Sequence, residues 1–390
     1  MRSPMSSASV LLLASVASAA LFAACSSPSD PPPATDAGVD GTVPDGTADA
    51  TADVDASDVL PDAPTDGGDG GVPDKLSATT LYSNFAGGTI SPALLEFAPA
   101  YFLWSDAALK RRWIELPPGT KIDTSNMDHW IFPIGTKFWK EFSRDGKKLE
   151  TRLIQHAADK SWIMGSYIWS ADQSDATWTT AGATNINGTD WDVPSLSKCQ
   201  ACHNAEPGRI NGFEAVQLSK PGPGLNLKWL ASMGMLSNPP PPGVDYPVPG
   251  DPRESLALGT LHANCGHCHN PGWEFFGLTN QVLRLNVADR TVPETTIFRS
   301  TVGQHTMSFK TIPLRIAPGD SGGSAIPFRM SHRGDAEAMP PIGTKRVDDP
   351  AIAAVRAWID SLPKPPPPPP DAGVDDGASD ATSDAIDTGP

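Results

Sequence analysis

Four of the five cysteines lie in two copies of one five-residue pattern. The first copy is Cys-Gln-Ala-Cys-His at 199–203, and the second is Cys-Gly-His-Cys-His at 265–269. Cysteines three positions apart lie on one face of a helix, so both sulfurs can reach the vinyl groups along one porphyrin edge. The histidine that follows can then bind the iron from the proximal side. This spacing is the attachment signature of c-type haem, and two copies predict two covalently bound haem c groups.

The predicted cofactor-binding residues are Cys199, Cys202, His203, Cys265, Cys268 and His269. Two other uses of the cysteines are a disulfide within each pair and a zinc ion held by all four. Neither use needs a histidine directly after each pair, so we favour haem.

The sixth iron position of the second haem has one leading candidate, Met339 in Ala-Met-Pro-Pro-Ile-Gly. A thioether suits low-spin iron and raises its reduction potential. Pro340 excludes the preceding residue from helical geometry and stiffens the loop. Met330 and His332 are the alternatives.

The distal ligand of the first haem stays open between several residues. Met233 and Met235 lie in a helix-like stretch at 225–236, and His262 lies three residues before the second motif. His129 and His156 could cap the pocket from the preceding module, and an open sixth position is a further alternative. His267, inside the second motif, is expected to face solvent.

The first 24 residues read as a secretory signal, with an uncharged apolar core at 10–24 that is short for a bilayer span. The core ends in Leu-Phe-Ala-Ala-Cys, which resembles a bacterial lipobox and predicts lipidation of Cys25. The alternative is an ordinary cleaved signal. If Cys25 is lipidated, the lipid is the only expected attachment to a membrane. We expect a cell-envelope lipoprotein that faces the periplasm or the cell surface, with the outer membrane favoured.

The net charge of −16 comes from two tails. Residues 26–74 hold 12 Asp and residues 371–390 hold 6, with no Lys or Arg in either segment. Segment 75–370 is close to neutral, so no basic nucleic-acid surface is indicated. Both tails are expected to be disordered spacers.

Eight of the eleven Trp fall in residues 76–191, where short aromatic and β-branched runs alternate with turn residues. Strands are expected at 130–134, 136–142, 149–155, 162–164 and 167–169, with a hairpin at Asp145-Gly146. We interpret this segment as an antiparallel sandwich or barrel whose Trp form a core. Helices are expected from about 318–321 to 330 and from about 349.

The predicted fold class is therefore multidomain α+β, with an N-terminal antiparallel β-rich module followed by two mostly α-helical cytochrome c-like haem regions. The expected division is a signal peptide at 1–24, an acidic tether at 25–75, the β-rich module at 76–191, a first haem region at 192–243, a second at 250–364, and a Pro/Asp-rich tail at 365–390.

In the order of its motifs, the chain resembles an uncharacterised family of bacterial dihaem c-type cytochromes with an N-terminal β-rich module. The resemblance covers roughly residues 80–363, and its last part is similar to exported cytochrome c domains with a Met-Pro-Pro loop. The stretches that carry it are 103–106, 110–114, 132–136, 150–153, 169–176, 199–203, 262–269, 318–320 and 339–341. It implies electron transfer to redox partners in the cell envelope, without an established reaction.

Two other functions compete with electron transfer. A dihaem peroxidase would leave the first haem open for peroxide, and a surface-binding module would dock the cytochrome regions on a glycan or a protein. The sequence favours an electron carrier over a catalyst and names no catalytic residue.

Overall fold

The computed structural model describes residues 71–366. The predicted signal peptide, Cys25, nearly all of the tether and nearly all of the C-terminal tail lie outside the described residues. Within 71–366 the chain is a mixed α+β protein that contains antiparallel sheets and α-helices. No helix in this range is long and apolar enough to cross a bilayer.

One six-stranded antiparallel sheet dominates the N-terminal half, and each strand pairs with its neighbours in sequence. Its strands are β3 (Leu95–Glu96), β4 (Leu109–Glu115), β5 (Lys137–Arg144), β6 (Lys147–His156), β7 (Trp162–Trp169) and β8 (Ala176–Thr179). A separate two-stranded ribbon pairs β1 (Tyr82–Asn84) with β2 (Thr89–Ile90).

The hairpin predicted at Asp145-Gly146 is confirmed, because both residues have positive φ, 53° and 75°, between β5 and β6. The two short strands expected at 162–164 and 167–169 are one continuous strand, β7. The strand expected at 130–134 does not form: apart from one isolated bridge at Ile131, the segment is loop. Pro133 interrupts this run and cannot donate to a ladder, which accounts for the miss.

The expected sandwich or barrel is wrong, because the sheet is open, with β3 and β8 at its edges. One face is covered by the N-terminal segment that leads into the β1–β2 ribbon. Leu76 and Leu81 of this segment pack with Trp113 and Trp139 of the sheet. The other face is covered by the chain after the first haem motif, where Phe138 packs with Leu218 and Leu227, among other residues. Connecting segments therefore bury both apolar faces, and no second large sheet is needed.

Residues 71–75, which the sequence assigned to the tether, already pack on this sheet. Val72 is buried in the same apolar cluster as Trp113. The Tyr167 hydroxyl donates a hydrogen bond to the Pro73 carbonyl at 2.8 Å. The ordered body therefore begins before residue 76.

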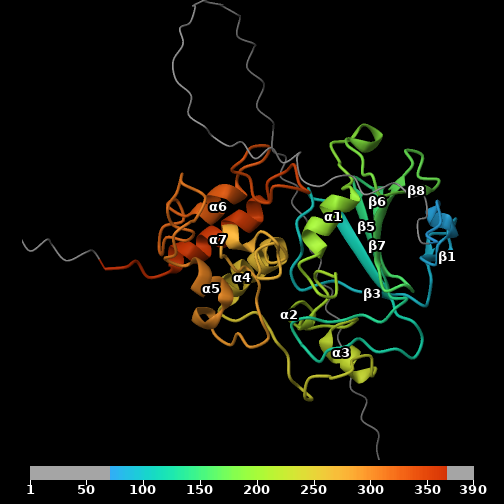
Figure 1. Ribbon diagram of the computed structural model, residues 1–390, viewed down its shortest axis with the longest axis horizontal. Coiled ribbons are helices and arrows are strands. Elements are labelled where there is room, and N and C mark those ends of the chain that lie inside the picture. Colours follow the sequence, from blue (N-terminus) through green and yellow to red (C-terminus); the bar gives the residue numbers. More distant parts are fainter. Residues whose placement is uncertain (1–70, 367–390) are drawn as a thin grey trace, which may run out of the picture. The chain divides into compact units, whose positions relative to one another are not determined.

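Short helices follow the sheet in sequence (Figure 1). Their bounds are α1 (Leu196–His203), α2 (Ala215–Leu218), α3 (Leu227–Ser232), α4 (Pro252–Cys265), α5 (Thr296–Thr301), α6 (Ala325–Met330) and α7 (Asp349–Ser361), with 3-10 turns at Leu76–Ala78, Ile186–Gly188, Phe276–Leu278 and Val292–Glu294. The predicted helix from 349 is confirmed as α7. The one expected from 318–321 begins only at Ala325, because the Asp320 side chain caps a turn at Gly323 instead.

Helices α4 and α7 pack together and form the core of the C-terminal half. A capping box fixes the start of α4: Asp251 accepts from the backbone of Glu254, whose side chain accepts from the backbone of Asp251. The apolar stripe predicted for the last helix is its buried face, with Val355, Trp358 and other residues packed in this core.

Candidate functional site

The first Cys-x-x-Cys-His motif occupies the end of α1, which packs against β7 (Figure 1). The helix buries none of its residues fully, and Cys199, Cys202 and His203 are all half-buried. Burial raises the pKa of the Cys199 thiol. The sheet, and not the helix itself, therefore supplies one wall around this motif.

His203 is held in the orientation that an iron ligand needs. Its Nδ1 lies 2.7 Å from the Arg209 carbonyl oxygen, which can only accept a hydrogen bond. Nδ1 therefore carries the proton, and Nε2 is left with a free lone pair. Burial lowers the pKa of His203 to about 4, so the ring is neutral at pH 7.

The second motif begins at the last residue of α4 and continues as a tight turn. The Cys268 and His269 amides donate to the Cys265 carbonyl at 3.1 and 2.8 Å, so the turn continues the direction of the helix. Burial lowers the pKa of His269 to about 4. Its buried Nδ1 has no hydrogen-bond partner among the residues that the structure describes, which is an unusual state for a buried polar atom.

A small pocket of about 80 Å³, partly open to solvent, lies beside this motif. It brings Cys265 and His269 together with Met339, the predicted distal ligand. The other lining residues are Thr279, Gln281, Leu283, Thr306, Met307, Ser308, Phe309, Arg315, Ala325, Ile326, Arg329 and Met330.

Main-chain hydrogen bonds hold Met339 in the pocket wall. Its amide donates to the Arg329 carbonyl at 3.0 Å, and its carbonyl accepts from the Arg333 guanidinium at 3.1 Å. Of the two alternatives, Met330 lines the same pocket, whereas the ring of His332 stacks on Phe328 outside the pocket lining.

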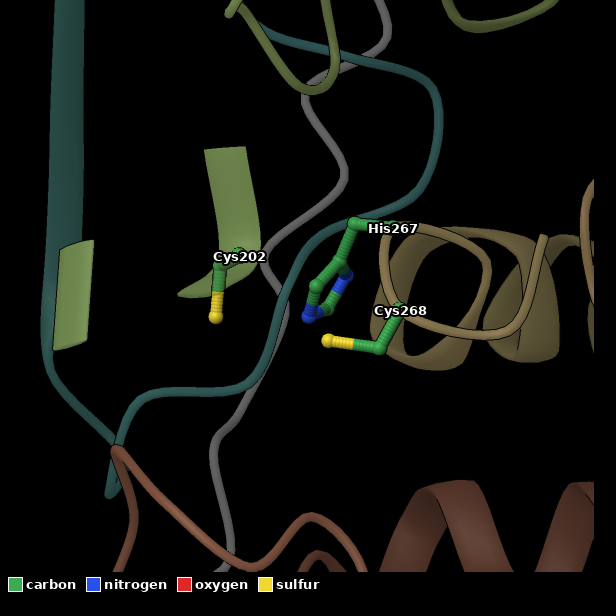
Figure 2. Close-up of side chains that lie close together, drawn as sticks. All are labelled: Cys202, His267 and Cys268. Carbon is green, nitrogen blue, oxygen red and sulfur yellow. The ribbon is translucent and has the colours of Figure 1, made fainter. Parts of the chain in front are cut away.

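The two motifs lie next to each other in the structure. A sulfur from Cys202, a sulfur from Cys268 and a ring nitrogen of His267 all lie within 4.8 Å of one another. Figure 2 shows the Cys268 and His267 side chains, which come from the turn after α4, pointing toward Cys202 at the end of α1. The expectation that His267 faces solvent is therefore wrong. A hydrogen bond between the two thiols lowers the pKa of Cys202 and raises that of Cys268.

Among the candidates for the first haem's distal ligand, His262 is already occupied. Its ring is buried, Nε2 pairs with Glu214 at 3.0 Å, and Nδ1 accepts from the Leu285 amide at 3.1 Å. Met233, directly after α3, is 56% exposed. Met235 packs against the apolar cluster that contains Phe138 and Leu227. The structure brings none of the three into the pocket beside Met339.

The two histidines of the β-rich module are also engaged. His129 Nδ1 lies 2.7 Å from Glu206, a buried carboxylate that also pairs with Arg284 of the C-terminal half. His156 Nδ1 bonds to the Phe132 carbonyl, and its ring stacks on Trp162. Glu206 therefore connects three parts of the chain, a role that sequence reasoning missed.

Asp106, another buried carboxylate that sequence reasoning left without a role, joins the β-rich module to the segment after Met339. It accepts from the Thr344 hydroxyl at 2.5 Å and from the amides of Lys345 and Arg346 at about 3 Å. Its only sequence signal was its place in Trp-Ser-Asp at 104–106, which carries no information about a partner 238 residues away.

The donor set fits c-type haem at both motifs. Each motif ends in a histidine that can bind iron: the Nε2 of His203 is free because Nδ1 is bound to the Arg209 carbonyl, and the pocket beside His269 contains a thioether. Nδ1 of His269 has no such hydrogen-bond partner among the described residues. No family model, no curated protein and no solved structure matches this chain.

Proposed function

We propose that this chain is a dihaem c-type cytochrome that transfers electrons in the bacterial cell envelope. The observation that carries the proposal is that both Cys-x-x-Cys-His motifs face each other, with Cys202 and Cys268 in one cluster less than 4.8 Å across. When bound, each haem iron would take up and release one electron. Attachment at adjacent cysteines would keep the two redox groups close together, as a carrier that relays electrons requires.

The residues of the chain have distinct roles in this proposal. Cys199 and Cys202 anchor the first haem, and His203 binds its iron through Nε2. Cys265 and Cys268 anchor the second, with His269 and Met339 as axial ligands. The hydrogen bond to the Arg209 carbonyl fixes the orientation of His203, and those to Arg329 and Arg333 fix the main chain of Met339. Such partners outside the iron's own ligands orient a ligand and tune the metal.

The finer fold assignment is part of the same proposal. We infer two cytochrome c-like haem regions after the β-rich module, in line with the resemblance to the dihaem family. The packing of α4, which carries the second motif, on the C-terminal helix α7 supports this inference for residues 250–364. Lipidation at Cys25 would anchor the whole chain to a membrane, with the outer membrane favoured, and redox proteins of the envelope would be its partners.

The deciding experiment is a haem stain of a denaturing gel with a pyridine haemochrome count on the purified full chain, exported from a host that matures c-type cytochromes. Two covalent haems per chain are expected. The matched control replaces Cys199, Cys202, Cys265 and Cys268 by Ser and should show none. A wild-type chain without covalent haem contradicts the proposal.

Optical spectra of both oxidation states on the same sample separate a carrier from a catalyst. Two six-coordinate, low-spin haems support electron transfer. A first haem that is five-coordinate or exchanges ligands supports the peroxidase alternative, and hydrogen peroxide with an electron donor is the first substrate to test. His262, whose ring nitrogens are both engaged, is a poor distal ligand, which keeps this alternative open.

One observation favours a second candidate, a metal-ion site. Cys202, His267 and Cys268 are the residue types that bind zinc, and their ligand atoms are close enough to share one ion. Cys199 and Cys265 do not belong to this cluster, so a zinc site would leave half of the paired cysteines without a role. Metal analysis of a His267→Ala variant separates the two: loss of stoichiometric zinc supports a zinc site, and an unchanged count of two haems supports haem.

A further inference from the structure

Three positively charged residues form a row across the middle of the sheet. Arg112 on β4 lies directly opposite Lys140 on β5, and Lys140 lies directly opposite Arg152 on β6. Directly opposed residues of antiparallel strands share one face of the sheet, with Cβ atoms about 4.5–5.5 Å apart. Like charges in this arrangement destabilise a sheet, so the row needs a compensating negative charge.

The chain supplies only one carboxylate to this row. Glu150 is fully buried and accepts two hydrogen bonds from the Arg152 guanidinium, at 3.0 and 2.6 Å. Ser166 and Trp191 occupy its remaining acceptor positions. Glu150 therefore binds Arg152 and forms no hydrogen bond to the other two cations of the row.

Arg112 and Lys140 have no carboxylate partner within residues 71–366. Arg112 is 7% exposed, and its Nη1 has no hydrogen-bond partner there. The Arg112 guanidinium lies 5.4 Å from the centre of the Phe102 ring, and the Lys140 ammonium lies 4.9 Å from the centre of the Phe142 ring. Lys110, two positions before Arg112 on β4, lies on the same face, but its ammonium donates to the Leu103 carbonyl at 2.6 Å. Arg112 and Lys140 are therefore the two cations of this face that bind no oxygen acceptor of the described residues, and a buried charge without a partner is destabilising. A bound partner with negative charges would balance them.

The apolar surroundings of the row argue against a freely exchanging anion. On one side, the same face continues with Ile114, Phe138 and Ile154, which are opposed in register and pack in an apolar cluster. On the other side lie Phe142, which is fully buried, and Lys110 directly opposite it. The partner must therefore be one that brings its own apolar surface to the sheet.

The first haem motif lies close to this row. Helix α1 packs against β7, the next strand after β6. Ser166 of β7 lies directly opposite Arg152, at the end of the row. The strand that α1 contacts is therefore the strand beside the row.

We propose that Arg112 and Lys140 bind the two propionate carboxylates of the first haem. This inference rests on the proposed function, because it requires a haem attached at Cys199 and Cys202. A haem brings two carboxylates on an otherwise apolar ring, which matches two cations without an oxygen acceptor beside an apolar surface. A planar guanidinium pairs with a carboxylate through two parallel hydrogen bonds, and an ammonium adds a point charge. The β-rich module would thus fix the orientation of the first haem.

The test uses the full-length holoprotein with Lys140→Gln and Arg112→Gln, and Lys160→Gln as the control. Lys160 is an exposed lysine in the turn between β6 and β7, so its variant removes the same charge from the same sheet. The haem carboxyl carbons are isotope-labelled by growth on labelled aminolaevulinate. The readouts are the labelled carboxylate bands in the infrared difference spectrum between the two oxidation states, and the reduction potential of each haem.

We expect Lys140→Gln and Arg112→Gln to shift the labelled carboxylate bands and to lower the potential of the first haem, because a nearby cation favours the ferrous form. The second haem and the Lys160→Gln protein should be unchanged. Lys140→Arg keeps the charge, so its first-haem potential should stay close to that of the wild type, which separates loss of charge from local misfolding.

Labelled bands that are identical in wild type, Lys140→Gln and Arg112→Gln overturn this inference. Titration with oxalate tests whether the row binds an external anion instead. Saturable changes in the first-haem spectrum that disappear in Lys140→Gln would show such binding and contradict the propionate site. A pyridine haemochrome count on the same samples keeps the two proposals apart. A count of two with unshifted bands rejects the propionate site alone, whereas a count of zero rejects the proposed function.

Discussion

The two Cys-x-x-Cys-His motifs share a sequence pattern but are supported by the chain in different ways. The second follows a 14-residue helix, α4, whose Leu258 and Leu261 are fully buried and which packs on α7. The first sits on the eight-residue helix α1, which buries none of its residues. One motif is therefore held by the core of its own half of the chain, and the other depends on the β-sheet beside it.

The charges near the two motifs differ in the same way. Arg315 and Arg329 in the wall of the second pocket donate to backbone carbonyls, for example from Arg315 to Ser300 at 2.7 Å. On the sheet, the buried Nη1 of Arg112 has no such acceptor among the described residues. The arginines beside the second motif are therefore bound to the main chain, whereas Arg112 beside the first is not.

The largest expected effect comes from removing one motif at a time. Cys265→Ser with Cys268→Ser should reduce the haem count from two to one, and so should Cys199→Ser with Cys202→Ser, because each pair anchors its own haem. The pyridine haemochrome count measures both. If the first-motif variant retains two haems, or the second-motif variant loses both, the two sites are not independent and the comparison fails.

The next largest effect is expected from Met339→Ala. Loss of the thioether should remove the sulfur-to-iron charge-transfer band and lower the potential of the second haem, since axial ligands set haem potentials over a range of about 0.8 V. The potential of the first haem should stay the same. Met233→Leu, an exposed methionine on α3, is the control. If the charge-transfer band survives in Met339→Ala but is absent from Met330→Leu, the distal ligand is Met330 and not Met339.

A pair of core substitutions tests whether the two regions are stabilised separately. Trp358 in α7 and Trp139 in β5 are both at most 2% exposed, and removal of either side chain should cost about 3–5 kcal/mol. In urea, Trp358→Ala should lose the spectrum of the second haem first, and Trp139→Ala that of the first haem. Loss of both spectra at one urea concentration in both variants would show one cooperative unit.

The smallest effect is expected from Asp106→Ala, which removes the link between the β-rich module and residues 344–346. Loss of these hydrogen bonds to a buried carboxylate should cost about 1–3 kcal/mol. The charge-transfer band of the second haem should also weaken at a lower temperature, because the loop after Met339 loses its anchor. Thr344→Val removes a single bond and should have a smaller effect. Equal thermal loss of the band in wild type and Asp106→Ala would show that the module does not stabilise this loop.

Local sequence signals predicted the elements that depend on neighbouring residues. The Asp145-Gly146 hairpin and helix α7 follow from turn chemistry and from an apolar stripe, and both are present. Strand 130–134 failed because Pro133 cannot pair, and the helix expected from 318–321 started late because Asp320 caps a turn. In both cases a local polar or proline effect outweighed an apolar pattern.

The sequence by itself determined which cysteines and histidines are candidates for haem binding, because their spacing in each motif is a short-range property of the chain. Only the tertiary structure decided what surrounds that chemistry. The meeting of Cys202 with Cys268, the placement of Met339 beside His269, and the row from Arg112 to Arg152 all join residues that are far apart in sequence. Such contacts depend on sheet register and helix packing, which no pattern within a few residues encodes.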